Sequence, residues 1–125
     1  MIDEIRGPLE KIHQGVDGAL AITLMGMDGL PVDTLHPTAS DHEDLDVSSL
    51  VVEYSTLLNQ VKSSAQMFAA GGLEELAISS EHLTMIIRPV TDEYFLALAL
   101  TPGANFGKGR YLLRVLAPTL AGALS

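Results

Sequence analysis

Residues 46–70 read DVSSLVVEYSTLLNQVKSSAQMFAA, and this stretch decides the fold. Its apolar residues recur every three to four positions, which is the spacing of one face of an α-helix. They are Val47, Leu50, Val51, Tyr54, Leu57, Leu58, Val61, Ala65 and Phe68. The sequence therefore predicts a long helix with one apolar stripe against a core.

The opposite face of this helix is short of charge. A solvated helix face normally carries charged residues, but Glu53 and Lys62 are the only ones inside this helix. The other outward positions are Ser49, Val52, Thr56, Asn59, Ser63 and Met67. We therefore expect another chain to cover this face, which favours an interaction module over an enzyme.

Strands are expected on both sides of the long helix. Residues 18–25 form an apolar strand, and a glycine-containing turn joins it to a second strand at 30–35. Pro31 has no N–H to donate, so this second strand belongs at a sheet edge. After the helix, a three-stranded meander is expected at residues 73–80, 83–90 and 94–101. Pro89 would either end the ladder at Arg88 or mark a bulge.

Shorter helices are expected at both ends of the chain. Residues 3–14 predict the first, and a final helix should run from about Gly107 to Leu120, where Pro118 ends or kinks it. Strands 18–25 and 94–101 are apolar on both faces, so helices must cover both faces of the sheet. The prediction is a single α/β (α+β) domain over residues 1–125. Its order is α-β-β-α-β-β-β-α, a three-layer α/β/α sandwich around a five-stranded antiparallel sheet.

Composition excludes several classes of function. The chain has seven Lys and Arg residues and sixteen Asp and Glu residues, a formal charge of −9. Nucleic acid and anionic membrane surfaces would therefore be repelled. The absence of cysteine excludes disulfides and thiolate zinc sites. The first residues are acidic where a signal peptide would be basic, and no apolar run reaches the roughly 20 residues of a membrane span. We expect a cytoplasmic protein.

No residues with catalytic, cofactor-binding or metal-binding roles are predicted. The glycine-rich segment 102–109 has the wrong spacing for a phosphate-binding loop and lacks its hydroxyl. The histidines do not pair with an activated nucleophile. The acidic run has no EF-hand spacing and reads as a solvated loop that caps the long helix; it comprises Asp41, Glu43, Asp44 and Asp46, with His36 and His42 nearby. The sequence predicts a protein that is not an enzyme.

Two surfaces are candidates for contacts with other chains. Strand 73–80 would be an open edge, a template for the same edge of an identical or related chain, although Glu74 and Glu75 would partly oppose pairing. The expected dimer or partner interface comprises Val52, Thr56, Asn59, Ser63, Met67, Glu75, Ala77 and Ser79. The only basic spot comprises Lys108, Arg110 and Arg114. It is either a solvated helix face or a contact for an acidic partner.

Three segments together resemble the Roadblock/dynein light-chain family. They are the hairpin GALAITLMGMDGLPVDT (18–34), the helix VVEYSTLLNQVKSSAQMFAAGG (51–72) and NFGKGRYLLR (105–114). The resemblance implies the sandwich fold and a homodimer in which the long helices pair and the third strands form one continuous sheet. It also implies that this dimer is a platform for a Ras-like small GTPase, as in the bacterial regulators of this family. Such a platform supplies no arginine finger and needs no cofactor.

A second function is a small-molecule sensor with a pocket between the long helix and the sheet. Met25, Met67, Met85 and Phe68 would line that pocket, although such residues are more often core packing.

Overall fold

The computed structural model describes residues 2–36 and 46–125 and contains the eight elements in the predicted order. The elements are α1 (Ile2–Gly15), β1 (Ala19–Gly26), β2 (Pro31–Leu35), α2 (Val47–Met67), β3 (Leu76–Ser79), β4 (Thr84–Pro89), β5 (Tyr94–Leu100) and α3 (Phe106–Leu124).

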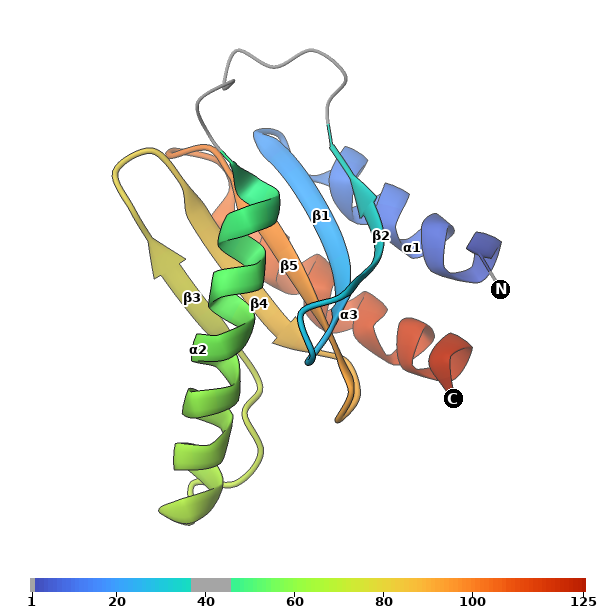
Figure 1. Ribbon diagram of the computed structural model, residues 1–125. Helices are drawn as coiled ribbons and strands as arrows, with labels where there is room; N and C mark the ends of the chain where they lie inside the picture. The colour runs from blue at the N-terminus through green and yellow to red at the C-terminus, as the bar shows by residue number, and fades with distance from the viewer. Residues whose placement is uncertain (1, 37–45) are drawn as a thin grey trace.

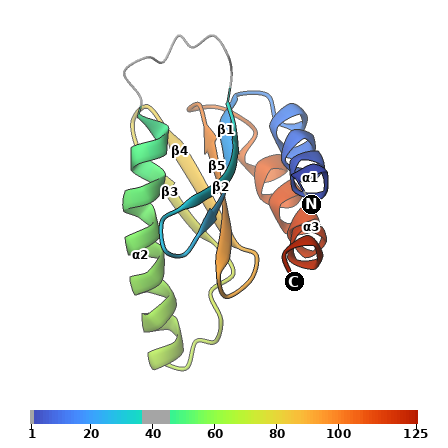
Figure 2. The ribbon, with the colours of Figure 1, turned by 45° about the vertical axis from the view of Figure 1, so that its right-hand side comes forward.

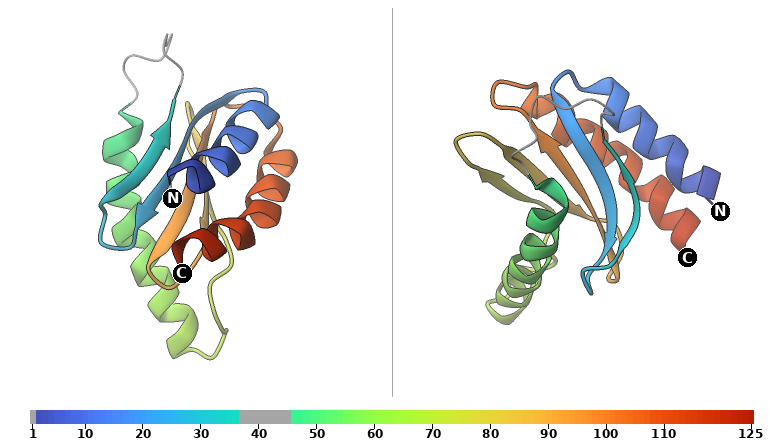
Figure 3. Two further views of the ribbon diagram at one scale, coloured as in Figure 1. Left: turned by 90° about the vertical axis from the view of Figure 1, so that its right-hand side faces the viewer. Right: turned by 45° about the horizontal axis from the view of Figure 1, so that its top comes forward.

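The five strands form one antiparallel sheet in the order β2-β1-β5-β4-β3. Helix α2 covers one face of it, while α1 and α3 lie side by side across the other (Figures 1, 2 and 3). The three-layer sandwich is therefore confirmed. The two edges are β2, which begins with Pro31, and β3, as the sequence predicts.

The face under α1 and α3 is densely buried. Alternate residues of β1, β4 and β5 point to it because successive strand side chains alternate between faces. Helix residues from both covering helices complete this core. Its buried members are Ile5, Leu9, Ile12, Val16, Ile22, Leu24, Ile86, Leu96, Leu98, Leu100, Leu113 and Leu120.

The face under α2 is covered less completely. Only three of the 21 residues of α2 are buried, namely Val51, Ser55 and Leu58. Val51 and Leu58 pack on strand residues that include Met25 and Phe95. The C-terminal part of α2 extends past the end of the sheet (Figure 1). Much of the surface of α2 is therefore not covered by its own domain.

Two residues of the predicted core stripe are exposed. Leu57 is 38% exposed and Phe68 is 79% exposed. Phe68 has no strand beneath it because it lies at the projecting end of α2, which stops at Met67 rather than Ala70. Leu57 lies about 100° around the helix from Leu58, which takes the central position against the sheet.

Two prolines are accommodated differently from the sequence prediction. Pro89 stays in the ladder as the last residue of β4, opposite Phe95. Since β3 pairs with β4 only as far as Ile87, the missing N–H of Pro89 interrupts no bond to β3. Pro118 does not end α3, which continues to Leu124, so the predicted end near Leu120 is wrong. Burial of Ala117 and Leu120 holds this segment of α3 on the core despite the lost hydrogen bond.

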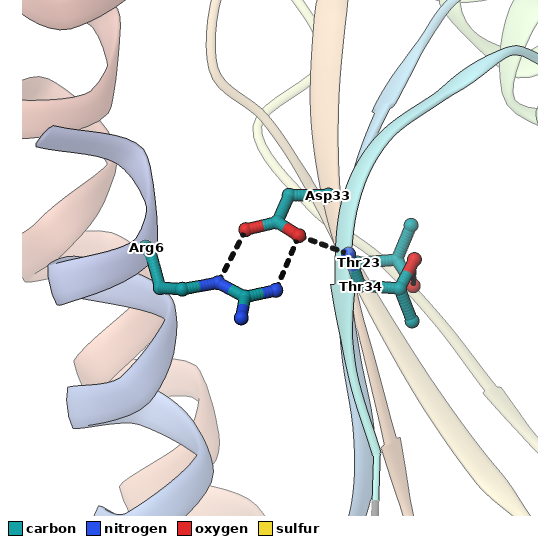
Figure 4. A network of polar contacts seen from close by, with 4 residues as sticks. All are labelled: Arg6, Thr23, Asp33 and Thr34. Atoms are coloured by element: carbon teal, nitrogen blue, oxygen red, sulfur yellow. Dashed lines mark hydrogen bonds and ion pairs between the residues drawn. The ribbon is translucent and has the colours of Figure 1, made fainter. Parts of the chain in front are cut away.

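An ion pair fastens α1 to the edge strand β2 (Figure 4). Arg6 donates from Nη2 to Asp33 Oδ1 at 2.7 Å and from Nε to Oδ2 at 3.0 Å. The backbone N–H of Thr34 also donates to Asp33 Oδ1, at 3.0 Å. The hydrogen bonds and charge of Arg6 hold the pKa of Asp33 below its ordinary value.

Candidate interaction surfaces

The start of α2 is fixed by Asp46, which belongs to the acidic run expected to cap it. Its Oδ1 accepts from the backbone N–H of Ser49 at 3.0 Å, and its Oδ2 accepts from the Ser49 hydroxyl at 2.7 Å. These hydrogen bonds lower the pKa of Asp46. The other acidic residues of that run, Asp41, Glu43 and Asp44, lie outside the described residues.

One flank of α2 contacts the β1–β2 turn of its own chain. The Asn59 side chain donates from Nδ2 to the carbonyl oxygen of Met27 at 2.9 Å and to that of Ser55 at 3.0 Å. Gly29, with φ +86°, lies so close that a Cβ there would be 3.8 Å from Val52 Cγ1. Two residues of the expected interface, Val52 and Asn59, therefore lie beside this turn, although both remain exposed.

The other flank of α2 is apolar and lies on the side of β3 (Figure 1). At about 100° per residue, its residues lie on the side of the helix away from Val52 and Asn59. We call it the β3-side flank; its members are Leu50, Leu57, Val61 and Phe68. Met67 is 76% exposed at the helix end and lies about 100° around the helix from Phe68, on the outward side that also carries the exposed polar residues Thr56 and Ser63.

Sequence reasoning did not separate the β3-side flank from the core stripe. The nine apolar positions span about 120° of the helix, an ordinary width for a stripe that faces a core. Only the position of the sheet shows which part of the stripe stays exposed.

Strand β3 leaves its outer edge unpaired among the described strands. Its register with β4 places Ala77 and Ser79 on the face that carries α3, and both side chains are exposed. Leu76 and Ile78 point to the α2 face. The strand begins only at Leu76, so Glu74 and Glu75 precede it and do not lie in its ladder.

Glu75 instead joins the basic spot. Arg110 Nε donates to Glu75 Oε1 at 2.8 Å, and this hydrogen bond with its charge raises the pKa of Arg110. The sequence assigned these residues to two different surfaces, and the structure brings them together. The third basic residue, Lys108, is exposed, and its backbone N–H donates to the capping Asn105 side chain at 3.0 Å.

A fourth basic residue, Arg88 of β4, was not predicted at this spot. It pairs with Leu96 and so points to the α3 face, where it lines a surface hollow of about 430 Å³ together with α3 residues. We call this the basic hollow; it is lined by Glu74, Glu75, Arg88, Gly107, Arg110, Tyr111 and Arg114. Residue 88 is separated from the other arginines by a strand and a turn, so only the register of the sheet could reveal the grouping.

The four residues expected to line a ligand pocket do not converge. Met25 and Met85 are buried in the core under α2, while Met67 and Phe68 are exposed at the end of that helix. Within residues 2–36 and 46–125, no three His, Asp or Glu side chains are grouped as metal ligands would be. In the same part of the chain, no helix is long and apolar enough to cross a membrane.

Comparisons with known proteins agree on the fold. The family model of the Roadblock/LC7 domain matches residues 9–100. The crystal structure of MglC from Myxococcus xanthus is 41% identical, with 96% of this chain and 98% of that chain covered and a TM-score of 0.69. No curated protein sequence matches the chain.

Two more distant structures resemble the chain in fold. The gliding protein MglB from Thermus thermophilus is 14% identical, with 96% of this chain and 87% of that chain covered and a TM-score of 0.82. A Roadblock/LC7 domain from Streptomyces avermitilis is 15% identical, with 94% and 95% covered and a TM-score of 0.79. With the family model over most of the chain and one relative of 41% identity, this protein belongs to the Roadblock/LC7 domain family.

Proposed function

We propose that this protein is a non-catalytic, cytoplasmic homodimer that binds a Ras-like small GTPase and modulates its nucleotide cycle or its localisation. The observation that carries the proposal is the exposed apolar β3-side flank of α2 beside the unpaired edge of β3. The dimer would place two copies of these neighbouring surfaces against each other.

Apolar exposure at this place is an argument for a dimer. Leu57 and Phe68 lie on one flank of a helix that buries only three residues in its own domain, and Met67 is exposed beside Phe68 at its end. Large apolar side chains exposed in this way mark contact sites. An open strand edge is satisfied by the same edge of a second copy, and a two-fold axis brings both features together.

Structural neighbours support assembly into multichain units. One solved structure is described as MglB with a tetrameric arrangement; it is 15% identical, with 97% of this chain and 87% of that chain covered and a TM-score of 0.82. At that identity the likeness concerns the fold. We infer only that a Roadblock sandwich of this shape is compatible with self-association.

The proposed dimer face is tested by two substitutions on opposite sides of the sheet. Leu57→Lys places a charge on the β3-side flank, while Thr119→Lys places the same charge on an exposed position of α3. Measuring molar mass by light scattering after size exclusion, we expect Leu57→Lys to give monomer and Thr119→Lys to keep the dimer. Equal masses for the two variants would show that the β3-side flank is not the contact.

The GTPase part of the proposal rests on family membership. The chain belongs to the Roadblock/LC7 family, and the resemblance noted in its sequence implies a platform for Ras-like GTPases. A platform of this kind needs surface, not a catalytic residue, so we assign the nucleotide chemistry to the GTPase.

Binding is measured by interferometry with a purified Ras-like GTPase from the same organism, loaded with GDP or with a non-hydrolysable GTP analogue. We expect saturable binding that differs between the two nucleotide states, and a changed rate of GTP hydrolysis or nucleotide release if the cycle is modulated. The absence of binding in both states would contradict the proposal, whatever the oligomeric state of the protein.

A further inference from the structure

The positive charge of this acidic protein is concentrated on one side. Four of the seven Lys and Arg residues lie on α3 or on the strand face beneath it, while the formal charge of the chain is −9. These four are Arg88, Lys108, Arg110 and Arg114. Of the other three, Arg6 is paired with Asp33, and Lys62 lies 3.9 Å from Asp92. Such segregation creates a local positive potential that the net charge conceals.

Three guanidinium groups line the basic hollow from two elements. Arg110 and Arg114 are four residues apart on α3, so they lie on the same side of that helix. Arg88 reaches the hollow from β4. Arg114 Cζ lies 5.7 Å from the centre of the Tyr111 ring, and Arg110 Cζ lies 5.6 Å from that of Phe106. Stacking of this kind orients a guanidinium while leaving its in-plane N–H groups available.

One of the three guanidinium groups already binds a carboxylate. Glu75 Oε1 accepts from Arg110 Nε at 2.8 Å. By contrast, no carboxylate of the described residues lies within 4.0 Å of Arg88 or Arg114. The hollow thus combines an internal carboxylate–guanidinium pair with two arginines that have no such partner in the described chain.

We propose that the basic hollow binds an acidic segment of a partner protein, whose carboxylates bond to Arg88 and Arg114 while Glu75 competes for Arg110. Arginine forms paired, charge-assisted hydrogen bonds with carboxylates, and the Glu75 contact is an internal example. A polyphosphate chain fits less well, because its closely spaced charges meet more repulsion from Glu74 and Glu75 than carboxylates spaced by neutral residues do.

Most of the lining of the hollow belongs to α3, which covers the face of the sheet opposite α2 (Figure 2). Glu74 and Glu75 complete the lining directly before β3, so the hollow adjoins the strand edge of the proposed dimer. The inference does not rest on the proposed GTPase function.

The test uses a fluorescein-labelled peptide of alternating Glu and Ser residues, titrated with the full chain and followed by anisotropy. We expect saturable binding that weakens with added salt. The double variant Arg88→Gln/Arg114→Gln should weaken it roughly tenfold or more, the change that corresponds to about 1.4 kcal/mol. The control Lys11→Gln/Lys62→Gln removes the same charge elsewhere and should change the affinity less than about twofold. Equal losses in both double variants would overturn the proposal.

A second variant tests the competition by Glu75. Glu75→Gln releases Arg110 and should tighten peptide binding severalfold, whereas Glu10→Gln on α1 adds the same charge change and should leave it nearly unaltered. An unchanged affinity for Glu75→Gln would contradict the competition. Oligothymidine of equal formal charge serves as the alternative ligand, and tighter binding of it than of the peptide would overturn the assignment to an acidic protein segment. Light scattering on each variant separates these outcomes from any change in dimerisation.

Discussion

At the scale of single residues, the fold depends on a few polar contacts between layers. The pair of Arg6 and Asp33 joins a helix on one face to the edge strand β2, which has a neighbour on one side only (Figure 4). An edge strand gains more from such a fastening than a central strand, because fewer backbone bonds hold it. The pair is therefore a good point at which to test the electrostatics of the fold.

Asp33→Asn should lower the free energy of unfolding, and the loss should depend on pH. The folded protein holds the pKa of Asp33 below the ordinary 3.8, so the ionised carboxylate stabilises the fold above that pH. This stabilisation disappears as the pH falls through the lowered pKa. Urea unfolding of wild type and variant should therefore differ most near neutral pH and converge in acid. Asp17→Asn, at an exposed position, serves as control. If the difference in free energy of unfolding between wild type and Asp33→Asn did not change with pH, the stabilising role of the ionised Asp33 would be contradicted.

At the scale of elements, α3 lies close against the sheet at a glycine. A Cβ on Gly109 would lie 3.0 Å from Leu98 Cδ2 and 3.4 Å from Ile86 Cδ1. Both neighbours are fully buried, so they have little room to move. The helix predicted from about Gly107 already includes Gly109, but only the packed structure shows that this glycine lies against the sheet.

Gly109→Leu should destabilise the protein by about 1–3 kcal/mol, because a large side chain cannot fit between α3 and the sheet. Gly122 lies in the same helix with open space around its Cα, so Gly122→Ala should instead stabilise by about 0.5–1 kcal/mol through helix propensity. Chemical denaturation of both variants measures these changes in the free energy of unfolding. If Gly109→Leu were as stable as Gly122→Ala, α3 would not pack as described.

The open edge of β3 can be tested by a substitution within the strand. Ala77 lies in the middle of this short strand, and proline there removes an N–H and restricts the backbone. If β3 pairs with its copy in a second chain, Ala77→Pro should weaken dimerisation, measured as an increased dissociation constant in sedimentation. If Leu57→Lys disrupts the dimer and Ala77→Pro does not, the dimer contact is made by the helices alone.

At the scale of the whole molecule, the sequence predicted the order of elements, the antiparallel sheet, its three layers and both edges. Periodicity and turn residues are local signals, and these features follow from them. Pro31, for example, placed β2 at an edge without any knowledge of its neighbours. The end of α3 was missed because burial of Ala117 and Leu120 outweighs the local effect of Pro118.

The interaction surfaces were predictable only in part. The charge-poor helix and the open edge were visible in the sequence, but which flank of α2 faces away from its own hairpin was not. That depends on contacts such as the bond of Asn59 to the turn at Met27. Likewise, the pairing of Glu75 with Arg110 and the approach of Arg88 depend on the register of β3 and β4 beside α3. Glu75, Arg88 and Arg110 are distant in the chain and come together only because the sheet places them beside α3.

The most direct test of the account is the molar mass of the protein in solution as a function of concentration. Each chain has a mass of 13.3 kDa. We predict twice that mass over the micromolar range, with Met67→Glu, at the exposed end of α2, shifted towards monomer. Thr119→Glu, exposed on α3 across the sheet, should remain dimeric. A wild-type protein that stays at the mass of one chain at every concentration would contradict the central claim that α2 and β3 form an interface between two copies.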